Sequence, residues 1–202
     1  MFVSQEYSAS LMSQSFWFHE LKAALKLKEN GLGYDEIKKR CVEENLFGAA
    51  KEYRALRMAG YVVNRLKTID DNTIEIFESS DLATKKLINL IAIIRTDYLF
   101  FEFIYEVFRE KIIIGDYYLD DSDVNVFFTR KETQSELVAG WKESTKKHLR
   151  SNYLNYLEEA GLITSENKIK KITPPILDVA LERYLKATGE EVIVKALTGV
   201  DN

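Results

Sequence analysis

The spacing of apolar and polar positions predicts a mainly α-helical protein. Apolar residues recur every three or four positions along most of the chain, and the two prolines, Pro174 and Pro175, are adjacent. In the first third of the chain this periodicity predicts helices at about residues 15–30, 34–44 and 48–66. A Gly-Leu-Gly turn separates the first two helices. Three helices with such a turn before the second are typical of a helix-turn-helix, although short helical bundles share the pattern.

The stretch Thr96–Asp116 predicts a helix that is buried on most of its sides. Glu102, Glu106 and Glu110 stand one above another on a helical projection, and aromatic and aliphatic side chains cover the rest. We therefore expect this helix at the centre of the fold. The flanking patterns predict further helices at about 74–79, 83–95 and 122–131, and an extended crossing at 115–121.

A basic helix followed by a hairpin is predicted in the C-terminal part. The helix covers about 142–160 and carries a stripe of apolar residues: Leu149, Tyr153, Tyr156 and Ala160. Two short strands, at about 162–164 and 168–173, follow with a polar turn between them. This is the order of a recognition helix and its wing, and a plain surface hairpin is the alternative. Beyond residue 178 the pattern predicts one or two helices broken near Gly189.

These elements predict a helical bundle with helix-turn-helix-like or winged-helix-like subdomains and a short C-terminal β-hairpin wing. We expect a helix-turn-helix-like domain at residues 1–68 and a helical domain at 69–202. The winged-helix-like element is expected at about 98–175.

The third predicted helix has two faces of different chemistry. The face expected to point to the core carries small and apolar residues: Ala49, Tyr53, Leu56, Gly60 and Val63. The neighbouring strip is mostly basic and carries one aromatic residue: Lys51, Arg54, Arg57, Tyr61 and Arg65. In the major groove of DNA, arginine pairs with guanine while neighbouring cations contact phosphates. A solvated surface with some acid–base pairing is the alternative interpretation.

The basic helix and the hairpin supply a second set of candidate nucleic-acid contacts. On the helix the candidates are Lys142, Lys146, Lys147 and Arg150. On the hairpin they are Lys168, Lys170 and Lys171. This pattern predicts phosphate contacts from a recognition helix and a wing.

The charge distribution is compatible with a nucleic-acid partner although the net charge is negative. The chain has 28 basic and 32 acidic residues, a net charge of −4. Residues 69–125 carry 13 acidic and 5 basic side chains, so the acid is concentrated in the middle and the two ends are mildly positive. Phosphate contact depends on local patches rather than on net charge. A charge-rich solvated surface is the simpler interpretation of the charges alone.

Signatures of catalysis and of metal binding are missing from the sequence. His19 and His148 have no partner at ligand spacing, and no glycine begins a phosphate-binding loop. Asp121, Asp123, Asn125 and Glu132 match a calcium loop, but its sixth position is Val126 where glycine is required. We interpret this run as the capped start of a helix instead. No metal and no cofactor are predicted.

The cysteine count and hydropathy predict a cytoplasmic protein. Cys41 is the single cysteine, so no intrachain disulfide can form, and a buried thiol is expected. The start of the chain lacks the basic and apolar regions of a signal peptide. The most apolar window, 87–94, is far shorter than the roughly 20 residues that cross a bilayer, so no membrane partner is expected.

Motifs spread over nearly the whole chain resemble the BrxA family, small accessory proteins of bacterial BREX phage-defence systems. The motifs are YSASL (7–11), SFWFHELK (15–22), EENLF (43–47), INLIAI (88–93), GDYYL (115–119), QSELVAGW (134–141) and YLNYLEEAGLI (153–163). The resemblance implies a non-enzymatic, helix-rich protein with winged-helix features that binds nucleic acid within a multi-protein defence system. Residues 188–202 carry no matching motif, and no catalytic residues come with the resemblance.

Together these observations favour an accessory protein that binds double-stranded DNA, mainly through its backbone, with other BREX components as further partners. An RNA-binding protein of the antitermination type is one alternative, because basic helical faces also bind folded RNA. A protein scaffold is another, with aromatic residues near the N-terminus as anchors: Phe2, Phe16, Trp17 and Phe18.

Overall fold

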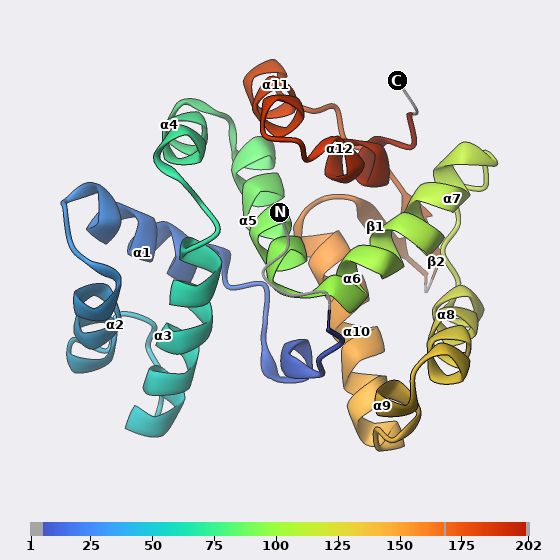
Figure 1. The fold of residues 1–202 in the computed structure, drawn as a ribbon, viewed down its shortest axis with the longest axis horizontal. Helices are drawn as coiled ribbons and strands as arrows, with labels where there is room; N and C mark the ends of the chain where they lie inside the picture. The colour runs from blue at the N-terminus through green and yellow to red at the C-terminus, as the bar shows by residue number, and fades with distance from the viewer. Residues whose placement is uncertain (1–5, 168, 201–202) are drawn as a thin grey trace.

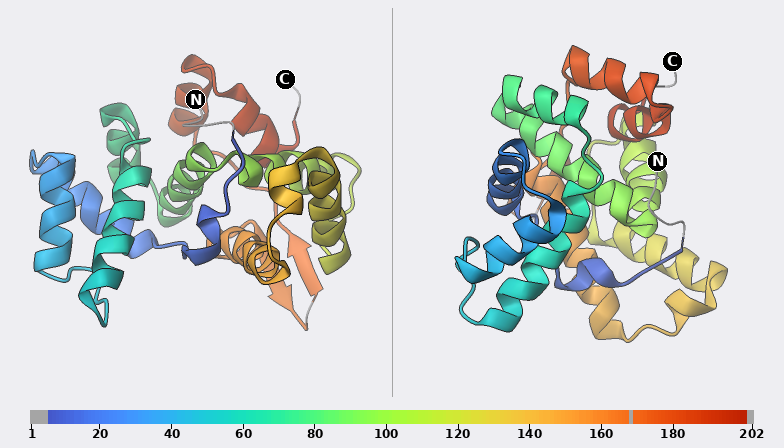
Figure 2. Two further views of the ribbon diagram at one scale, coloured as in Figure 1. Left: turned by 60° about the horizontal axis from the view of Figure 1, so that its bottom comes forward. Right: turned by 60° about the vertical axis from the view of Figure 1, so that its left-hand side comes forward.

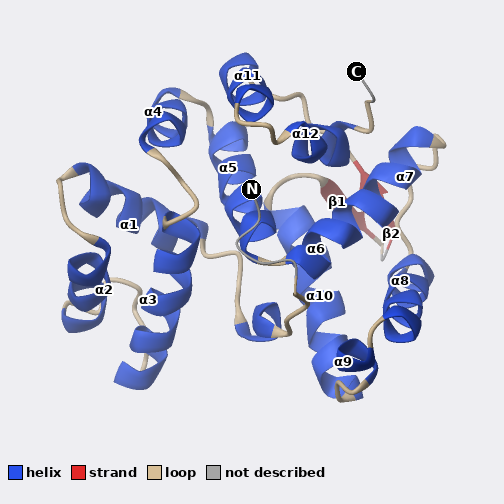
Figure 3. Cartoon of the chain, viewed as in Figure 1, coloured by secondary structure: helices blue, strands red, loops and turns tan. Residues whose placement is uncertain are grey.

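The computed structural model describes residues 6–167 and 169–200, and it confirms the mainly α-helical class with a small antiparallel hairpin (Figures 1 and 3). The N-terminal elements are the 3-10 turn η1 (Ser10–Ser13), α1 (Phe18–Glu29), α2 (Tyr34–Glu43), α3 (Glu52–Leu66), α4 (Asp71–Ser79) and α5 (Leu82–Thr96). The central elements are α6 (Tyr98–Phe103), the π-helical turn η2 (Ile104–Phe108) and α7 (Arg109–Ile113). The C-terminal elements are α8 (Asp121–Gln134), α9 (Glu136–Ala139), α10 (Glu143–Glu159), β1 (Ile163–Glu166), β2 (Ile169–Ile172), α11 (Val179–Ala187) and α12 (Glu191–Thr198).

The first helix begins three residues later than its apolar pattern predicts. Neither Ser13 nor Ser15 caps it; the N-cap is Trp17, whose backbone has a left-handed φ of 49°. Such a conformation is strained for a bulky residue and persists only where the surroundings impose it. Here the preceding residues are held by side chains from α3, α5 and α10, for example Asn89, which donates to the Phe16 carbonyl at 2.8 Å. Tertiary contacts therefore determine where α1 starts.

Aspartate caps explain why the middle helices start where they do. The Asp70 side chain accepts from the backbone N–H of Thr73 at 2.9 Å, and Asp81 accepts from Thr84 at 2.8 Å. Asp97 accepts from Phe100 at 2.9 Å at the start of α6. In each case the side chain satisfies a backbone donor that has no partner inside the helix.

The predicted central helix is present but is interrupted by the π-helical turn η2. Phe100 and Phe103 are fully buried and pack against Tyr153 of α10, with ring centroids 4.8 and 5.3 Å apart. Glu102 and Glu106 turn toward Lys131 of α8, whose Nζ lies 2.7 and 2.6 Å from their carboxylates. Burial lowers the pKa of Lys131, but the two carboxylates outweigh it and leave that pKa raised. The row of glutamates along this helix is thus partly an internal ion-pair site.

The hairpin follows α10, as predicted, and has a third extended segment beside it. Ile163 pairs with Ile172, and Glu166 pairs with Ile169. On the other side of β2, the Leu119 N–H donates to the Lys170 carbonyl at 2.9 Å. The predicted extended crossing at 115–121 therefore lies along the hairpin.

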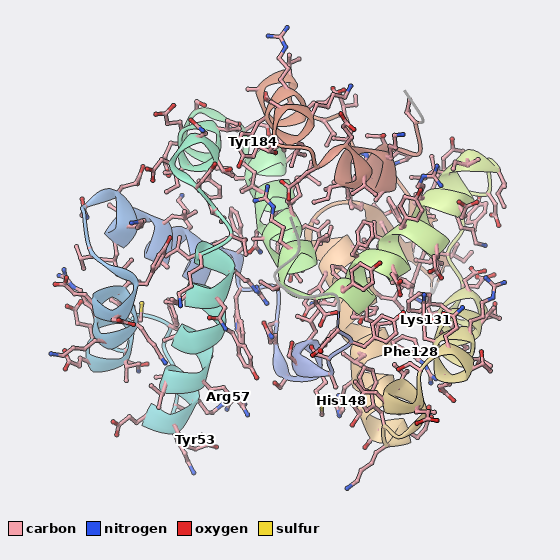
Figure 4. All side chains as sticks on the ribbon, in the orientation of Figure 1. Tyr53, Arg57, Phe128, Lys131, His148 and Tyr184 are labelled. Carbon is pink, nitrogen blue, oxygen red and sulfur yellow. The ribbon has the colours of Figure 1, made fainter. Side chains whose placement is uncertain are left out.

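Helix α5 lies in the middle of the molecule (Figures 1 and 2). It contacts α1, α3 and α4 on one side and α6 and α10 on the other. Most of its side chains are buried, in agreement with its continuous apolar pattern. The predicted C-terminal pair of helices closes the fold, and the Tyr184 hydroxyl of α11 donates to Asp70 at 2.8 Å (Figure 4). Within the described residues, no helix combines the length and hydrophobicity that crossing a bilayer requires.

Candidate nucleic-acid interface

Helix α3 presents a different face to solvent from the one its sequence predicts. Tyr53 and Leu56, expected in the core, are 62% and 53% exposed. The residues that face the core are Ala55, Ala59, Val62, Val63 and Leu66. The expected core face is therefore wrong by about one residue, because the large apolar side chains near the start of α3 point outward and small alanines point inward.

Three of the predicted cations of α3 are exposed at its outer end. The side chains of Lys51, Arg54 and Arg57 form no hydrogen bond or ion pair with any described residue. The exposed ring of Tyr53 lies at the same end of α3 as Arg57 (Figure 4). This end of the helix therefore offers three unpaired positive charges and one aromatic surface to a ligand.

Arg65 does not belong to this surface, and its predicted contact with nucleic acid is contradicted. Its side chain is 1% exposed. It donates to the Phe16 carbonyl at 2.6 Å, to the Ser15 carbonyl at 2.9 Å and to the Gln14 amide oxygen at 3.0 Å. Burial lowers the pKa of Arg65 to about 10, so the guanidinium remains charged at neutral pH. Its role is to hold the segment that precedes α1.

Lys146 of α10 is also unavailable, in contrast to its predicted role. It is 8% exposed, and its Nζ lies 2.8 Å from Glu132 and 3.2 Å from Glu143. The hydrogen bond from Lys146 to Glu132 raises the lysine pKa. The apolar stripe of α10 is confirmed, and it explains this placement: Lys146 lies three residues before Leu149, on the side of the helix that packs on the core.

Two further predicted cations are neutralised by carboxylates. Arg150 pairs with Glu143 at 2.7 Å, and Lys170 of the hairpin pairs with Asp121 at 2.7 Å. The hydrogen bonds from Lys146 and Arg150 hold the pKa of Glu143 below its ordinary value. A groove of about 400 Å³ between α8 and α10 includes Asp121, Glu143 and Arg150 in its lining, so its charges are mixed. Lys168 lies outside the described residues.

The remaining predicted cations, Lys142, Lys147 and Lys171, are exposed and make no ion pair with any described residue. Lys147 lies on the outward face of α10, opposite the buried stripe. Other polar residues that sequence reasoning missed share this face: Ser144, His148 and Ser151. The buried apolar stripe of α10 could have predicted these residues, since residues opposite it must face solvent.

Helices α3 and α10 each project a polar side chain on the same side of the molecule. Arg57 and His148 both project there, on either side of η1 (Figure 4). Hydrogen bonds join η1 and the residues after it to both helices. The Ser13 hydroxyl lies 3.4 Å from the Tyr61 hydroxyl of α3, and Asn152 of α10 donates to the Leu11 carbonyl at 2.7 Å.

Other candidate chemistry has a structural explanation. The pKa of Cys41 is raised to about 11 by burial, so its thiol is unreactive at neutral pH. In the calcium-like run, Asp120 forms a capping box with Asp123 at the start of α8. Across residues 6–167 and 169–200, no three His, Cys, Asp or Glu side chains are grouped so as to hold a metal ion.

The aromatic residues proposed as scaffold anchors do not form an exposed patch. Phe16 and Phe18 are buried, and Trp17 is partly buried against the core. Phe2 lies outside the described residues. These aromatics therefore supply packing rather than a docking surface.

Comparisons with known proteins agree with the motifs. The family model described as BrxA matches residues 5–189. The BREX protein BrxA of Bacillus cereus (strain H3081.97) is 35% identical over 199 residues, which cover 98% of this chain and 100% of that protein. A crystal structure of an uncharacterized protein from Magnetospirillum magneticum has the same fold, with a TM-score of 0.81, 19% identity and coverage of 96% of this chain and 99% of that one. The chain thus belongs to the BrxA family.

Proposed function

We propose that this protein binds double-stranded DNA mainly through the phosphate backbone, as an accessory component of a BREX phage-defence system. The observation that carries the proposal is the group of unpaired cations at the outer end of α3: Lys51, Arg54 and Arg57. Three of the other predicted cations, Lys146, Arg150 and Lys170, have carboxylate partners, so this group of three unpaired cations at one helix end stands out from an anionic molecule. Unpaired cations lose little on meeting phosphates and release counterions from the DNA.

The shape of the surface favours DNA over RNA. The cations and Tyr53 lie on the exposed face of a helix, and the major groove of B-form DNA admits a helix. The major groove of A-form RNA is too narrow and deep for side chains to read. The α8–α10 helices with the following hairpin support a winged-helix-like contact at the second set of cations, where Lys147 and Lys171 would meet phosphates.

The role in phage defence rests on family membership. The Bacillus cereus relative is named a BREX protein, and this chain aligns with all of that protein. Other BREX components are therefore proposed partners of this chain.

A charge-reversal pair tests the DNA proposal. Arg54→Glu with Arg57→Glu should weaken binding to a duplex at least tenfold, because two phosphate contacts become repulsions. The matched control is Lys39→Glu with Arg40→Glu on α2, whose cations already pair with Glu43 and Glu44 at 3.8 and 2.7 Å. Equal binding by the two double variants in an electrophoretic shift assay contradicts the proposal.

Competition with a structured RNA of equal length decides between the two nucleic acids. Duplex DNA should displace the bound duplex at lower concentration than the RNA does. An RNA that competes better than DNA favours the antitermination-type alternative.

Protein docking is a second candidate for the same end of α3. Leu46, Tyr53 and Leu56 are 41%, 62% and 53% exposed, and together they make this end partly apolar. Docking would be favoured over DNA binding if a second BREX component stays bound to the protein after nuclease treatment. That binding should then be lost on Leu56→Ser and kept on Arg57→Glu.

A further inference from the structure

The segment before α1 connects two surfaces that do not bond to each other. In the described part of the chain, α3 and α10 share no hydrogen bond or ion pair. Each is bonded instead to residues 11–16, which run between them. We call these residues the clamp segment.

The hydrogen bonds of α10 with the clamp segment all go to backbone carbonyls. Asn152 donates to the Leu11 carbonyl at 2.7 Å and to the Gln14 carbonyl at 3.1 Å. The Tyr156 hydroxyl donates to the same two carbonyls, at 3.3 and 2.8 Å. Tyr156 is fully buried and Gln14 is 6% exposed, so these bonds are shielded from water. Losing them would leave the Gln14 carbonyl without a donor, whereas the Leu11 carbonyl would still accept from the Gln14 N–H at 3.2 Å.

The contacts of α3 with the clamp segment are equally specific. Arg65 reaches Gln14, Ser15 and Phe16 through three hydrogen bonds. Trp17, next to the clamp segment, stacks on Tyr61 of α3 with ring centroids 6.1 Å apart. Gln14 is the residue common to both sides, since its amide oxygen accepts from α3 and its carbonyl accepts from α10.

We infer that the clamp segment holds the exposed cations of α3 and the outward face of α10 in register, so that one DNA duplex contacts both at once. This inference rests on the proposed DNA binding. Arg57 and His148 project on the same side of the molecule, on either side of η1 (Figure 4). A fixed spacing makes the second contact intramolecular and raises affinity without any new contact. Gln14, Arg65, Asn152 and Tyr156 are then positioning residues that touch no DNA.

Duplex length tests the inference. Hairpin-closed duplexes from about 6 to about 24 bp cover half a helical turn to more than two turns. The protein should bind the longest duplex about 100-fold more tightly than the shortest, and one protein should bind one long duplex. Affinity that does not change with length, or two long duplexes bound per protein, overturns the inference.

A variant that breaks only the α10 side of the clamp segment separates positioning from charge. Asn152→Ala with Tyr156→Phe removes all four hydrogen bonds from α10 and changes no cation. It should lose about tenfold in affinity for the longest duplex and keep its affinity for the shortest. The control is Asn155→Ala on the same helix, which is exposed and has no hydrogen bond to the clamp segment. Unchanged binding of the longest duplex by the folded double variant overturns the positioning role.

A surface variant gives a result that does not depend on the stability of the clamp segment. Arg54→Glu with Arg57→Glu leaves Lys51 as the one unpaired cation of the α3 group, so its affinity should depend far less on duplex length. A length dependence equal to that of the unmodified protein contradicts the inference. If the unmodified protein binds no duplex of any length, the proposed function itself fails, which is a different outcome from length-independent binding.

Discussion

The outer end of α3 and the first half of α10 carry the same kinds of residue but differ in what those residues can do. On α3, Arg54 and Arg57 are exposed and have no carboxylate partner among the described residues. On α10, Lys146 and Arg150 meet Glu132 and Glu143 within 2.8 Å. A cation that is already paired gains little from a phosphate, because it must first give up its carboxylate. Availability, rather than the number of cations, therefore distinguishes the two regions.

The largest expected effect separates the two ends of α3. Arg65→Ala should lower the free energy of unfolding by about 4 kcal/mol, because it empties a buried site, leaves the Gln14 amide oxygen and the Ser15 carbonyl without this donor, and leaves the Phe16 carbonyl with only Asn89. Arg57→Ala, at the exposed end, should change it by less than about 0.5 kcal/mol. Urea unfolding followed by circular dichroism measures both. Similar destabilisation by the two substitutions would contradict the assignment of a structural and a surface arginine on one helix.

Asp97 is a buried anion without a cation partner among the described residues, whereas Lys146 is a buried cation with two carboxylate partners. Asp97 is 2% exposed and its pKa is raised to about 6, chiefly by burial. Between pH 3.8 and about pH 6, Asp97 is protonated in the folded protein but ionised in the unfolded chain. The free energy of unfolding therefore rises as pH falls through this range, and above about pH 6 the buried charge of Asp97 lowers it. Asp97→Asn should therefore be more stable than the unmodified protein at pH 8, by at most about 3 kcal/mol, and equal to it near pH 4.

A second helix cap gives the control for this pH dependence. Asp81 is exposed, and hydrogen bonds from Thr84 lower its pKa. It therefore stabilises the fold above its ordinary pKa, and that contribution is lost as pH falls through the lowered value. Asp81→Asn should be less stable than the unmodified protein at pH 8, with a difference that shrinks in acid. Differences of the same sign for Asp81→Asn and Asp97→Asn would show that burial does not control Asp97.

Freeing Arg150 of α10 from its carboxylate partner should strengthen DNA binding, while Lys146 stays paired with Glu132. Glu143→Gln removes the carboxylate shared by Lys146 and Arg150 and keeps the size of the side chain. We expect the affinity for a duplex to rise about threefold to tenfold, with a steeper salt dependence. Fluorescence anisotropy at two salt concentrations measures this change. Glu158→Gln, an exposed residue on the same helix without a salt bridge to any described residue, is the control. A gain in affinity no larger than that of the control would mean that pairing does not limit this surface.

The smallest expected effect concerns Cys41, whose buried thiol has a raised pKa. At pH 7.5 the folded protein should react with iodoacetamide at least tenfold more slowly than the unfolded chain, because little thiolate is present and access is blocked. Mass spectrometry of the alkylated protein follows the reaction. Equal rates for folded and unfolded protein would contradict the burial of α2 against α3.

The elements of this fold were predictable from the sequence, but the orientation of several helices was not. The stripe of large residues on α10 predicts its buried face, since Leu149 and Tyr153 have no other place in a soluble helix. On α3 the same reasoning fails, because Tyr53 and Leu56 lie outward and Ala55 and Ala59 lie inward. Small residues carry little apolar signal even when a close helix contact requires them.

The pairing of cations was beyond the reach of sequence reasoning. Glu132 is 14 residues from Lys146, and Asp121 is 49 residues from Lys170. Only the packing of α8 against α10 and of the hairpin against α8 brings these partners together. Arg65 is a similar case, because its acceptors lie about 50 residues earlier in the chain.

The salt dependence of duplex binding tests the central claim, that exposed cations without a carboxylate partner contact phosphates. The exposed predicted cations without a carboxylate partner in the described part of the chain are Lys51, Arg54, Arg57, Lys142, Lys147 and Lys171. If all of them contact phosphates, the logarithm of the binding constant should fall with the logarithm of salt concentration with a slope of about −5, and of about −3.5 for Arg54→Glu with Arg57→Glu. A slope near zero, or the same slope for both proteins, would contradict the account.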